Sequence, residues 1–474
     1  MSSIDVIVKR YASSEMVEIF SQERRGLLWR DLWIALAEAE NELGLHVSES
    51  QIEELKKNRK KINWEAVEKY EAKVRHDVMA HVKAYGDVAP KAAGIIHLGA
   101  TSAYVTDNAD LVMMKEGMQL ILGKVACLIS NLSDFAKKRK DTPTLAYTHF
   151  QAAQPTTVGK RACLWIQNFL MDLELLEFEL DHLRFHGVKG ATGTQDSFLK
   201  LFNGDKKKVL QLDQKVMKKM GFTKMFIPTG QTYPRKVDSR VLAALASIAE
   251  SASKFANDLR LLQAIHEMEE PMEADQIGSS AMPYKRNPMR SERVCSLARY
   301  VMNLVHNCRE TAANHWFERT LDDSANRRIV IPHAFLLTDA SLDLLINVTS
   351  GLRVNEGIIN QNMDRELPFL QTEEILMAAV SEGGDRQQLH EKIREHAFET
   401  VKNMREKGKP NDLLQRLRGD KAFEKVAPKL LVKTDAKRLT GMASDQVDLF
   451  LDTYLVELRK KYKSFMQNKP KIRV

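Results

Sequence analysis

The chain has 474 residues, of which 44% are hydrophobic and 28% are charged, and its formal net charge at pH 7 is +8. This composition is that of a globular protein, and at roughly 150 residues per domain the length allows about three domains. Charged residues interrupt every long apolar stretch, and no run approaches the roughly 18 apolar residues of a membrane span. The first residues also lack the apolar core of a secretory signal, so we expect a cytoplasmic protein.

The basic residues are spread along the chain, so the net charge indicates anionic small ligands at least as readily as nucleic acid. The cysteines are scattered and form no CxxC pair, which indicates neither a disulfide framework nor a zinc site. We therefore expect reduced thiols packed in the core. The four cysteines are Cys127, Cys163, Cys295 and Cys308.

Three segments show helical periodicity. Residues 124–138 carry apolar side chains on one face, and 162–185 are apolar over much of the circumference, as in a helix buried among several neighbours. After Asp238, apolar residues alternate spacings of three and four, which predicts a long central helix in a bundle. Strand-like alternation is scarce, so we predict an all-α fold. The periodic positions are Val125, Leu128, Ile129, Leu132, Phe135 and Ala136, then Leu245, Ile248, Ala252, Phe255, Leu259 and Leu262.

Glycine and proline cluster in a few breaks between these segments, which we interpret as loops that join long helices. They lie at 145–157, 187–198, 227–236 and 278–288. We predict three domains from this division. They are an N-terminal helical domain (1–100), a central bundle domain (101–354) and a C-terminal helical domain (355–474) with loops at GKPND and GDKAF.

His149 lies in the first of these breaks rather than on an apolar helix face. Histidine is the usual general acid at neutral pH, so His149 is a candidate for proton transfer, and a plain polar loop residue is the alternative. The sequence RHD at 75–77 is a second polar cluster, but its spacing does not match HExxH, and we expect no metal. His182 and His186 are four residues apart, which indicates a solvated helical face.

The stretch GSSAMPYKRNP (278–288) is the most unusual loop. Asn287 is a good N-cap and Pro288 suits a first helical turn, so the loop is expected to lead into a helix over 289–307. Gly278 and small neighbours suit a loop that closes over a ligand. In a closed loop, Lys285 and backbone N–H groups can stabilise a serine alkoxide. The alternative is a flexible surface loop with incidental serines.

Arginines gather at two places. Arg286, Arg290 and Arg293 lie near the start of the predicted helix, where cations oppose the helix dipole unless an anion binds or Glu292 and neighbouring acids neutralise them. The stretch ERTLDDSANRR (318–328) adds three more arginines around a serine. Guanidinium groups match the geometry of carboxylate and phosphate, and a salt-bridged surface helix is the alternative.

Taken together, these segments resemble the fumarase/aspartase superfamily, whose signature loop GSSxMPxKxNP is matched at every fixed position by 278–288. More narrowly, they are similar to the adenylosuccinate lyase family of the animal type. Ala152 departs from this pattern, which has proline there. The matching stretches are RYAS (10–13), RHDVMAH (75–81), HLGATS (97–102), THFQ (148–151), TGQTY (229–233), PYKRNPMRSER (283–293) and ERTLDDSANRR.

The resemblance implies an all-helical, three-domain fold, a homotetramer whose active sites are shared between subunits, and no metal or organic cofactor. It also implies β-elimination of fumarate from adenylosuccinate and from the succinyl-aminoimidazole-carboxamide ribotide. Ser279 would be the general base, with Ser280 as the fallback, and His149 the general acid. Lys285 would hold the anion and Glu292 would orient the imidazole. Substrate contacts would come from Arg10, Tyr11, Arg75, His76, Asp77, Thr101, Ser102, Gln231, Asn287, Arg293, Arg319, Ser324 and Arg328.

Three alternatives remain at this point. Argininosuccinate lyase is a related enzyme, but RYAS and the arginine-rich 283–293 stretch suit a phosphorylated ligand. A basic helical scaffold for RNA would need basic stripes with interleaved aromatics, whereas aromatics are only 7% of the chain and fall mostly at core positions. A silent protein on the lyase fold should have lost Ser279 or His149, and both are present.

Overall fold

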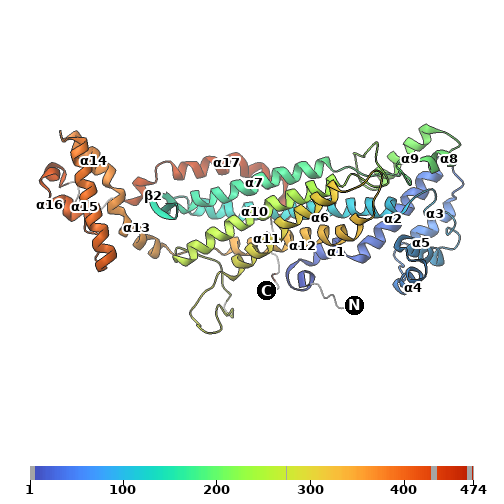
Figure 1. The fold of residues 1–474 in the computed structure, drawn as a ribbon, viewed down its shortest axis with the longest axis horizontal. Coiled ribbons are helices and arrows are strands. Elements are labelled where there is room, and N and C mark those ends of the chain that lie inside the picture. The colour runs from blue at the N-terminus through green and yellow to red at the C-terminus, as the bar shows by residue number, and fades with distance from the viewer. Residues whose placement is uncertain (1–5, 274, 429–434, 467–471, 473–474) are drawn as a thin grey trace.

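The computed structural model describes residues 6–273, 275–428, 435–466 and 472. Long helices lie side by side along the long axis of the molecule and form a central bundle (Figure 1). The all-α prediction is therefore confirmed. The bundle helices are α6 (Ser102–Lys138), α7 (Val158–His182), α10 (Lys236–Ala264), α11 (Met289–Ala313) and α12 (Asp322–Ser350).

The predicted helical periodicity is confirmed in these helices. The seam residues after Asp238 are all buried in α10, and the 124–138 face lies in α6 with only Phe135 partly exposed. None of the four cysteines forms a disulfide, and all four are buried. Lys124 of α6 is almost fully buried and pairs with Asp343 of α12, with 2.6 Å between Nζ and Oδ1. This charge pair lies inside the apolar interface between the two helices.

A first group of helices runs along the side of the bundle to one of its ends, and a second group forms the opposite end (Figure 1). The first group comprises η1 (Ile7–Tyr11), α1 (Ser14–Ile19), α2 (Gln22–Glu42), α3 (Glu49–Asn58), α4 (Trp64–Val74), α5 (Asp77–Val88), α8 (Asp196–Leu201) and α9 (Lys206–Lys219). The second comprises α13 (Glu356–Leu370), α14 (Thr372–Ser381), α15 (Arg386–Lys407), α16 (Leu413–Gly419) and η2 (Lys421–Val426).

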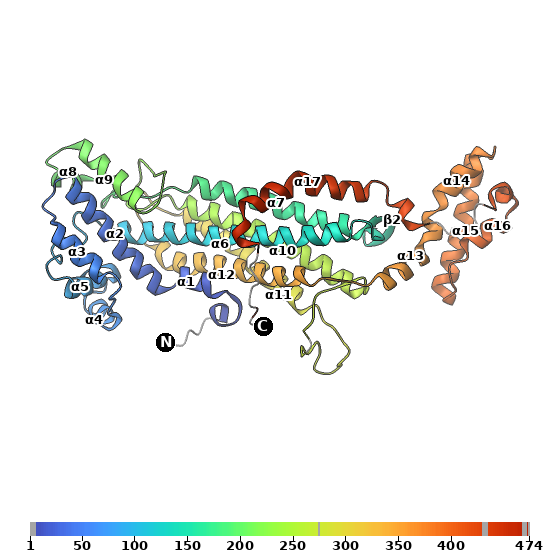
Figure 2. The same cartoon turned by 180° about the vertical axis from the view of Figure 1, so that it is seen from behind.

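The final helices return toward the bundle. Helices α14 to α16 and η2 share a small core of their own, whereas α17 (Ala443–Lys461) packs along α6 and α7 (Figure 2). Val447, Leu451 and Leu458 of α17 belong to the main core. The short helices η4 (Ala436–Leu439) and η5 (Lys463–Phe465) flank α17. The three-domain division stays a prediction, and α17 packs with the bundle helices rather than with α14 to α16.

Two small antiparallel sheets were not expected. Strands β1 (Pro143–Thr148) and β2 (Gln151–Thr157) form a hairpin, and β3 (Met268–Glu269) pairs with β4 (Arg353–Val354). The interpretation of 145–157 as a plain loop was wrong. His149 and Phe150 form the two-residue turn with φ of 53° and 58°, the positive values that a tight hairpin turn requires.

Two further observations concern α12 and the two histidines that are four residues apart. Helix α12 is long and apolar enough to cross a membrane by length and composition, although 83% of its apolar window is buried inside the protein. Such burial is typical of a core helix. His182 ends α7 and is exposed, but His186 lies beyond the helix and is buried, with Nε2 3.3 Å from Thr229 Oγ1. The pair therefore does not form a solvated helical face.

Candidate active site

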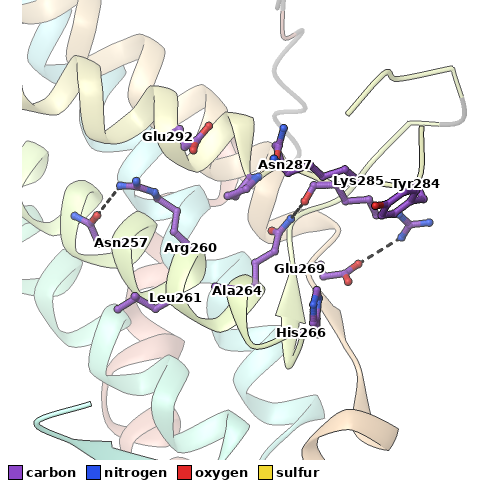
Figure 3. A pocket seen from close by; sticks show the side chains of 13 residues that line it. Asn257, Arg260, Leu261, Ala264, His266, Glu269, Tyr284, Lys285, Asn287 and Glu292 are labelled. Atoms are coloured by element: carbon purple, nitrogen blue, oxygen red, sulfur yellow. Dashed lines mark hydrogen bonds and ion pairs between the residues drawn. The ribbon is translucent and has the colours of Figure 1, made fainter. Parts of the chain in front are cut away.

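The loop between β3 and α11 borders a cavity of about 880 Å³, whose other wall is the C-terminal part of α10 (Figure 3). Lys285, Asn287 and Glu292 line this cavity together with Arg260 and His266 of the α10 side. The structure thus brings together three residues that the sequence singled out. It combines cations, an amide and a carboxylate around one space, which is a suitable composition for binding an anionic substrate.

The loop is closed on itself at its two ends. The side-chain amide of Asn287 donates to the carbonyl oxygen of Gly278 at 2.9 Å. A Cβ at Gly278 would lie 2.3 Å from the carbonyl oxygen of Lys285, so only glycine fits this approach. Ser279 follows directly, and its Oγ accepts from the backbone N–H of Met282 at 3.1 Å. The serine therefore sits in a tight turn and its oxygen faces an N–H donor.

The predicted helix after the loop is confirmed and runs to Ala313, but Asn287 is not its N-cap. Pro288 takes that position. The buried carboxylate of Glu270 accepts instead from the backbone N–H groups of Arg290 and Ser291, each at 3.0 Å. Glu270 therefore satisfies the helix start, and the Asn287 side chain closes the loop through its amide N–H group.

Acids of the preceding segment neutralise two of the three loop arginines. Arg290 is buried, pairs with Glu273 and donates to the carbonyl oxygen of Pro271 at 2.8 Å. Arg286 lies 3.4 Å from Glu269. The neighbouring acids, rather than Glu292, thus offset the cost of these cations near the helix start. Glu292 is exposed and remains directed to the cavity.

His149 is exposed at the tip of the β1–β2 hairpin. Its neighbours Tyr147 and Phe150 line a second cavity, of about 780 Å³, whose far wall comes from α13 and α15. Within the described residues, His149 makes no hydrogen bond or ion pair with Ser279 or Glu292. One chain therefore does not bring the histidine and the proposed base into contact.

A third group of site residues meets where α5, α6 and α12 begin. Ser102 Oγ lies 3.1 Å from His76 Nε2, and Arg328 donates to Asp77 at 2.6 Å. Burial alone would raise the pKa of the Asp77 carboxyl, but the Arg328 guanidinium beside it lowers this pKa below its ordinary value. His76 also caps α5 through Met79, and Arg75 occupies the left-handed C-cap of α4 with φ of 54°.

The remaining predicted contacts are divided between segments beside this group and η1. Thr101 is the N-cap residue of α6. Gln231 donates to the carbonyl oxygen of Ala191 at 2.9 Å, and its backbone N–H donates to Glu318 at 3.0 Å, so the breaks at 187–198 and 227–236 meet the 318–328 stretch. Arg319 lies 3.9 Å from Asp323. The other predicted residues here are Ser324 in α12, partly exposed, and Arg10 and Tyr11 in η1, exposed and partly exposed.

A buried ion network holds these segments in place. Arg235 pairs with Asp107 at 3.0 Å and with Asp323 at 2.6 Å, and all three side chains are about 1% exposed. Arg327 pairs with Asp238 at 2.7 Å and is buried, so this arginine of the 318–328 stretch has a structural partner rather than a free face. Buried pairs of this kind are expensive to break, which fixes the geometry around Gln231 and Arg328.

The length of α6 separates His149 from the residues around His76, namely Asp77, Ser102 and Arg328 (the His76 group), within one chain. Ser102 begins this helix, and the hairpin with His149 follows directly after its last residue, Lys138. At 1.5 Å per residue, 37 helical residues span roughly 55 Å. Figure 1 shows α5 and β2 at opposite ends of the bundle. A single small molecule cannot touch both groups of one chain.

Sequence reasoning missed the acidic residues that hold the site. Glu267, Glu269 and Glu270 each bind a different element, and none was singled out. The available signal was the run HEMEE between a long helix and the signature loop, where three acids stand beside a cluster of arginines. Among the described residues, no group of three or more potential ligands could hold a metal ion.

Comparisons with known proteins agree with this geometry. A family model described as "Lyase" matches residues 9–303, and one described as "Adenylosuccinate lyase C-terminus" matches residues 368–450. A solved 3-carboxy-cis,cis-muconate lactonizing enzyme from Pseudomonas putida has a TM-score of 0.82 at 21% identity, covering 97% of this chain and 99% of its own. A fumarate lyase from Mesorhizobium sp. BNC1 has a TM-score of 0.79 at 22% identity, with 94% and 98% covered.

The bundle and its signature loop thus define a lyase of the fumarase/aspartase superfamily. Adenylosuccinate lyase of Schistosoma mansoni is 49% identical over 96% of this chain and 96% of its own. That of Schizosaccharomyces pombe is 48% identical over 97% and 96%. The chain belongs to the adenylosuccinate lyase family and is a carbon–nitrogen lyase, so the resemblance read from its motifs is confirmed.

Proposed function

We propose that this lyase releases fumarate from adenylosuccinate, giving AMP, and from the succinyl-aminoimidazole-carboxamide ribotide in purine nucleotide biosynthesis. The observation that supports the proposal most is the signature loop. Its two ends are joined by the hydrogen bond from Asn287 to Gly278, and Lys285 and Asn287 face one cavity with Glu292. Together with the Arg328–Asp77 and Ser102–His76 contacts, it supplies donors for carboxylate and phosphate groups.

The reaction begins at a weak carbon acid. Ser279, as an alkoxide, takes the proton from the carbon next to one succinyl carboxylate, and the carbanion is held as an aci-carboxylate. Hydrogen-bond donors already in position stabilise this charge, and Lys285 and Asn287 have that role. The N–H of Met282, 3.1 Å from Ser279 Oγ, favours the ionised oxygen. Ser280 is exposed beside it and is the fallback base.

The elimination is completed at the nitrogen. The electron pair of the carbanion forms the carbon–carbon double bond of fumarate, the C–N bond breaks, and His149 protonates the departing nitrogen. Glu292 orients the imidazole. Each proton-transfer group contributes roughly 10²–10⁴-fold in rate. Binding comes from the remaining residues, namely Arg10, Tyr11, Arg75, His76, Asp77, Thr101, Ser102, Gln231, Arg293, Arg319, Ser324 and Arg328, and no metal or organic cofactor takes part.

These roles require more than one subunit. His149 and the His76 group are separated by the length of α6, so a substrate that contacts both must lie between chains. Exposed apolar residues on α7 supply a matching surface, because their spacing of three, four and seven is that of a helix seam awaiting a partner. They are Leu164, Met171, Leu175 and Phe178. We propose a homotetramer in the cytoplasm, with three domains per chain.

The direct test is fumarate release by the purified protein from adenylosuccinate, with argininosuccinate in parallel. Release from adenylosuccinate alone is expected. Release from argininosuccinate alone would keep the elimination chemistry and overturn the phosphate-binding role of the His76 group. No release from either substrate by a folded oligomer would overturn the proposed substrates.

A further inference from the structure

The segment 267–270 joins α10 to the signature loop, and its three glutamates bind three different parts of the site. Glu269 lies 3.4 Å from Arg286 inside the loop, and Glu270 holds the first backbone N–H groups of α11. Glu267 points the other way, to the hairpin that carries His149. One short segment is thus attached to the loop of the proposed base and to the support of the proposed acid.

Glu267 is fully buried and accepts hydrogen bonds from two elements. From β1, Tyr147 Oη donates at 3.0 Å to Oε1 and Thr144 Oγ1 donates at 3.2 Å to Oε2. From α13, the amide of Asn362 donates at 3.0 Å to Oε1. Its backbone is fixed as well, since the Glu267 carbonyl accepts from the N–H of Asn355 at 2.9 Å.

The charge of Glu267 strengthens the hydrogen bonds that it accepts. A hydrogen bond to a carboxylate is roughly twice as strong as one between neutral groups, and a buried carboxylate deprived of its donors is costly. Burial and the nearby Glu267 carboxylate raise the pKa of the Tyr147 hydroxyl, so Tyr147 stays a donor. Arg161 of α7 adds a donor to the same strand, binding the carbonyl oxygen of Leu145.

The hairpin turn depends on such support. His149 and Phe150 both occupy the left-handed region without being glycine, a conformation that persists only when the surroundings enforce it. The strand residue Tyr147 lies two positions before the histidine and is pinned to Glu267. We propose that Glu267 is a positioning residue, which holds the β1–β2 hairpin so that the imidazole of His149 reaches the departing nitrogen.

This inference rests on the proposed function, in which Ser279 takes the proton from carbon and His149 gives one to nitrogen. A displaced hairpin affects only the second transfer. The carbanion then returns to substrate more often, because the carbon can regain a proton from the base before the C–N bond breaks. In D₂O, the proton that Ser279 has taken exchanges with solvent before it returns to the carbon, so substrate recovered before completion should carry more deuterium per turnover.

The test compares deuterium exchange into substrate with fumarate release in the intact oligomer. Glu267→Gln keeps the size of the side chain but removes the charge, and Tyr147→Phe removes one hairpin donor. Each variant is expected to lower kcat by about 10- to 100-fold with little change in KM, the range for misplacing a reacting group by about 1 Å. The exchange-to-elimination ratio is expected to rise several-fold.

Tyr70→Phe is the matched control. Tyr70 also donates to an acid, with Oη 3.1 Å from Asp87, but on the exposed surface of α4. This variant should keep wild-type values of kcat and of the ratio. If Glu267→Gln does not fold, Tyr147→Phe, together with Thr144→Val, carries the test on the hairpin side.

The outcomes separate the inference from the function on which it rests. A fall of exchange and elimination in the same proportion, or unchanged kcat in both hairpin variants, would overturn the positioning role of Glu267. His149→Gln is measured alongside. If it leaves elimination unchanged, the general-acid role itself fails, whatever Glu267 does; if it slows elimination and Glu267→Gln does not, only the inference fails.

Discussion

The two ends of the bundle differ in how complete their share of the site is. At the end formed by α4, α5 and the start of α6, His76 already contacts Ser102 and Asp77 already binds Arg328. At the other end, His149 is exposed on a turn and makes no hydrogen bond or ion pair with Ser279 or Glu292 among the described residues. At one end the proposed site residues are already joined within the chain, whereas at the other the proposed general acid is exposed and, on the proposed mechanism, needs a neighbouring chain.

The largest effect is expected when the hydroxyl of Ser279 is removed from the signature loop. Ser279→Ala should lower kcat by roughly 10²–10⁴-fold, because it removes the proposed base, whose Oγ accepts from the N–H of Met282. The melting temperature should stay at the wild-type value, since the side chain is partly exposed. Ser280→Ala serves as the control; a loss of activity in that variant alone would move the base to Ser280.

Removing the preformed pair at the other end should act on binding instead. Arg328→Met removes the guanidinium that we propose to bind the substrate. A charged hydrogen bond to an anionic substrate group is worth about 1.5–3 kcal/mol, so KM for the substrate should rise roughly 10- to 100-fold with a smaller change in kcat. Steady-state kinetics measures the two constants. Arg394→Met, which breaks an exposed arginine–glutamate pair on α15, is the control and should change neither.

The need for a neighbouring chain can be tested on α7. Met171 is 63% exposed in the middle of the apolar seam, so Met171→Glu should place a charge in the subunit interface and dissociate the oligomer. Activity should fall in proportion to the oligomer lost, as measured by light scattering and assay on the same samples. Met377→Glu alters an equally exposed methionine on α14 and should leave the oligomer intact. An active monomer would contradict the shared site.

A smaller effect is expected on the free energy of unfolding, from a buried carboxyl at the end of the bundle that carries His76. Glu40 of α2 is fully buried and has no hydrogen-bond partner among the described residues, and burial raises the pKa of its carboxyl from 4.5 to about 8. The folded state keeps the proton while the unfolded state loses it, so between pH 4.5 and 8 stability falls as pH rises. The loss from this group is about 1.4 kcal/mol per pH unit.

Glu40→Gln removes that dependence, so the variant should gain stability over the wild type at pH 8 and gain little at pH 5. Urea unfolding at both values measures the difference. Glu42→Gln is the control with the opposite sign, because hydrogen bonds from Lys215 and Lys219 lower the pKa of Glu42. An equal gain for Glu40→Gln at pH 5 and pH 8 would mean that the buried carboxyl is not the cause.

Residue periodicity predicted the helices well and the site only in part. The seam from Leu245 to Leu262 is buried in α10 because a bundle helix repeats its contacts along its whole length. The β1–β2 hairpin was missed because its strands are short and its turn, His149 and Phe150, lacks the glycine that marks such turns. Burial and long-range hydrogen bonds, not local preference, set that turn.

The prediction of Asn287 as an N-cap failed for a similar reason. Asn287 is a good N-cap by local preference, but Glu270 lies beside the start of α11 and takes the N–H groups first. The sequence places both residues near the start of this helix without showing which of them accepts its first backbone N–H groups. It also cannot show that the motifs at 75–77 and 148–151 lie at opposite ends of α6, because that follows from the unbroken length of this helix, roughly 55 Å.

The central claim is that one active site takes residues from opposite ends of different chains. The most direct measurement mixes two inactive variants, His149→Gln and the double variant His76→Ala with Arg328→Met, refolds them together and assays fumarate release. Mixed oligomers should recover activity well above either parent, because some sites then contain no altered residue. Activity that stays at the average of the two parents would contradict the claim and place both groups in a site of a single chain.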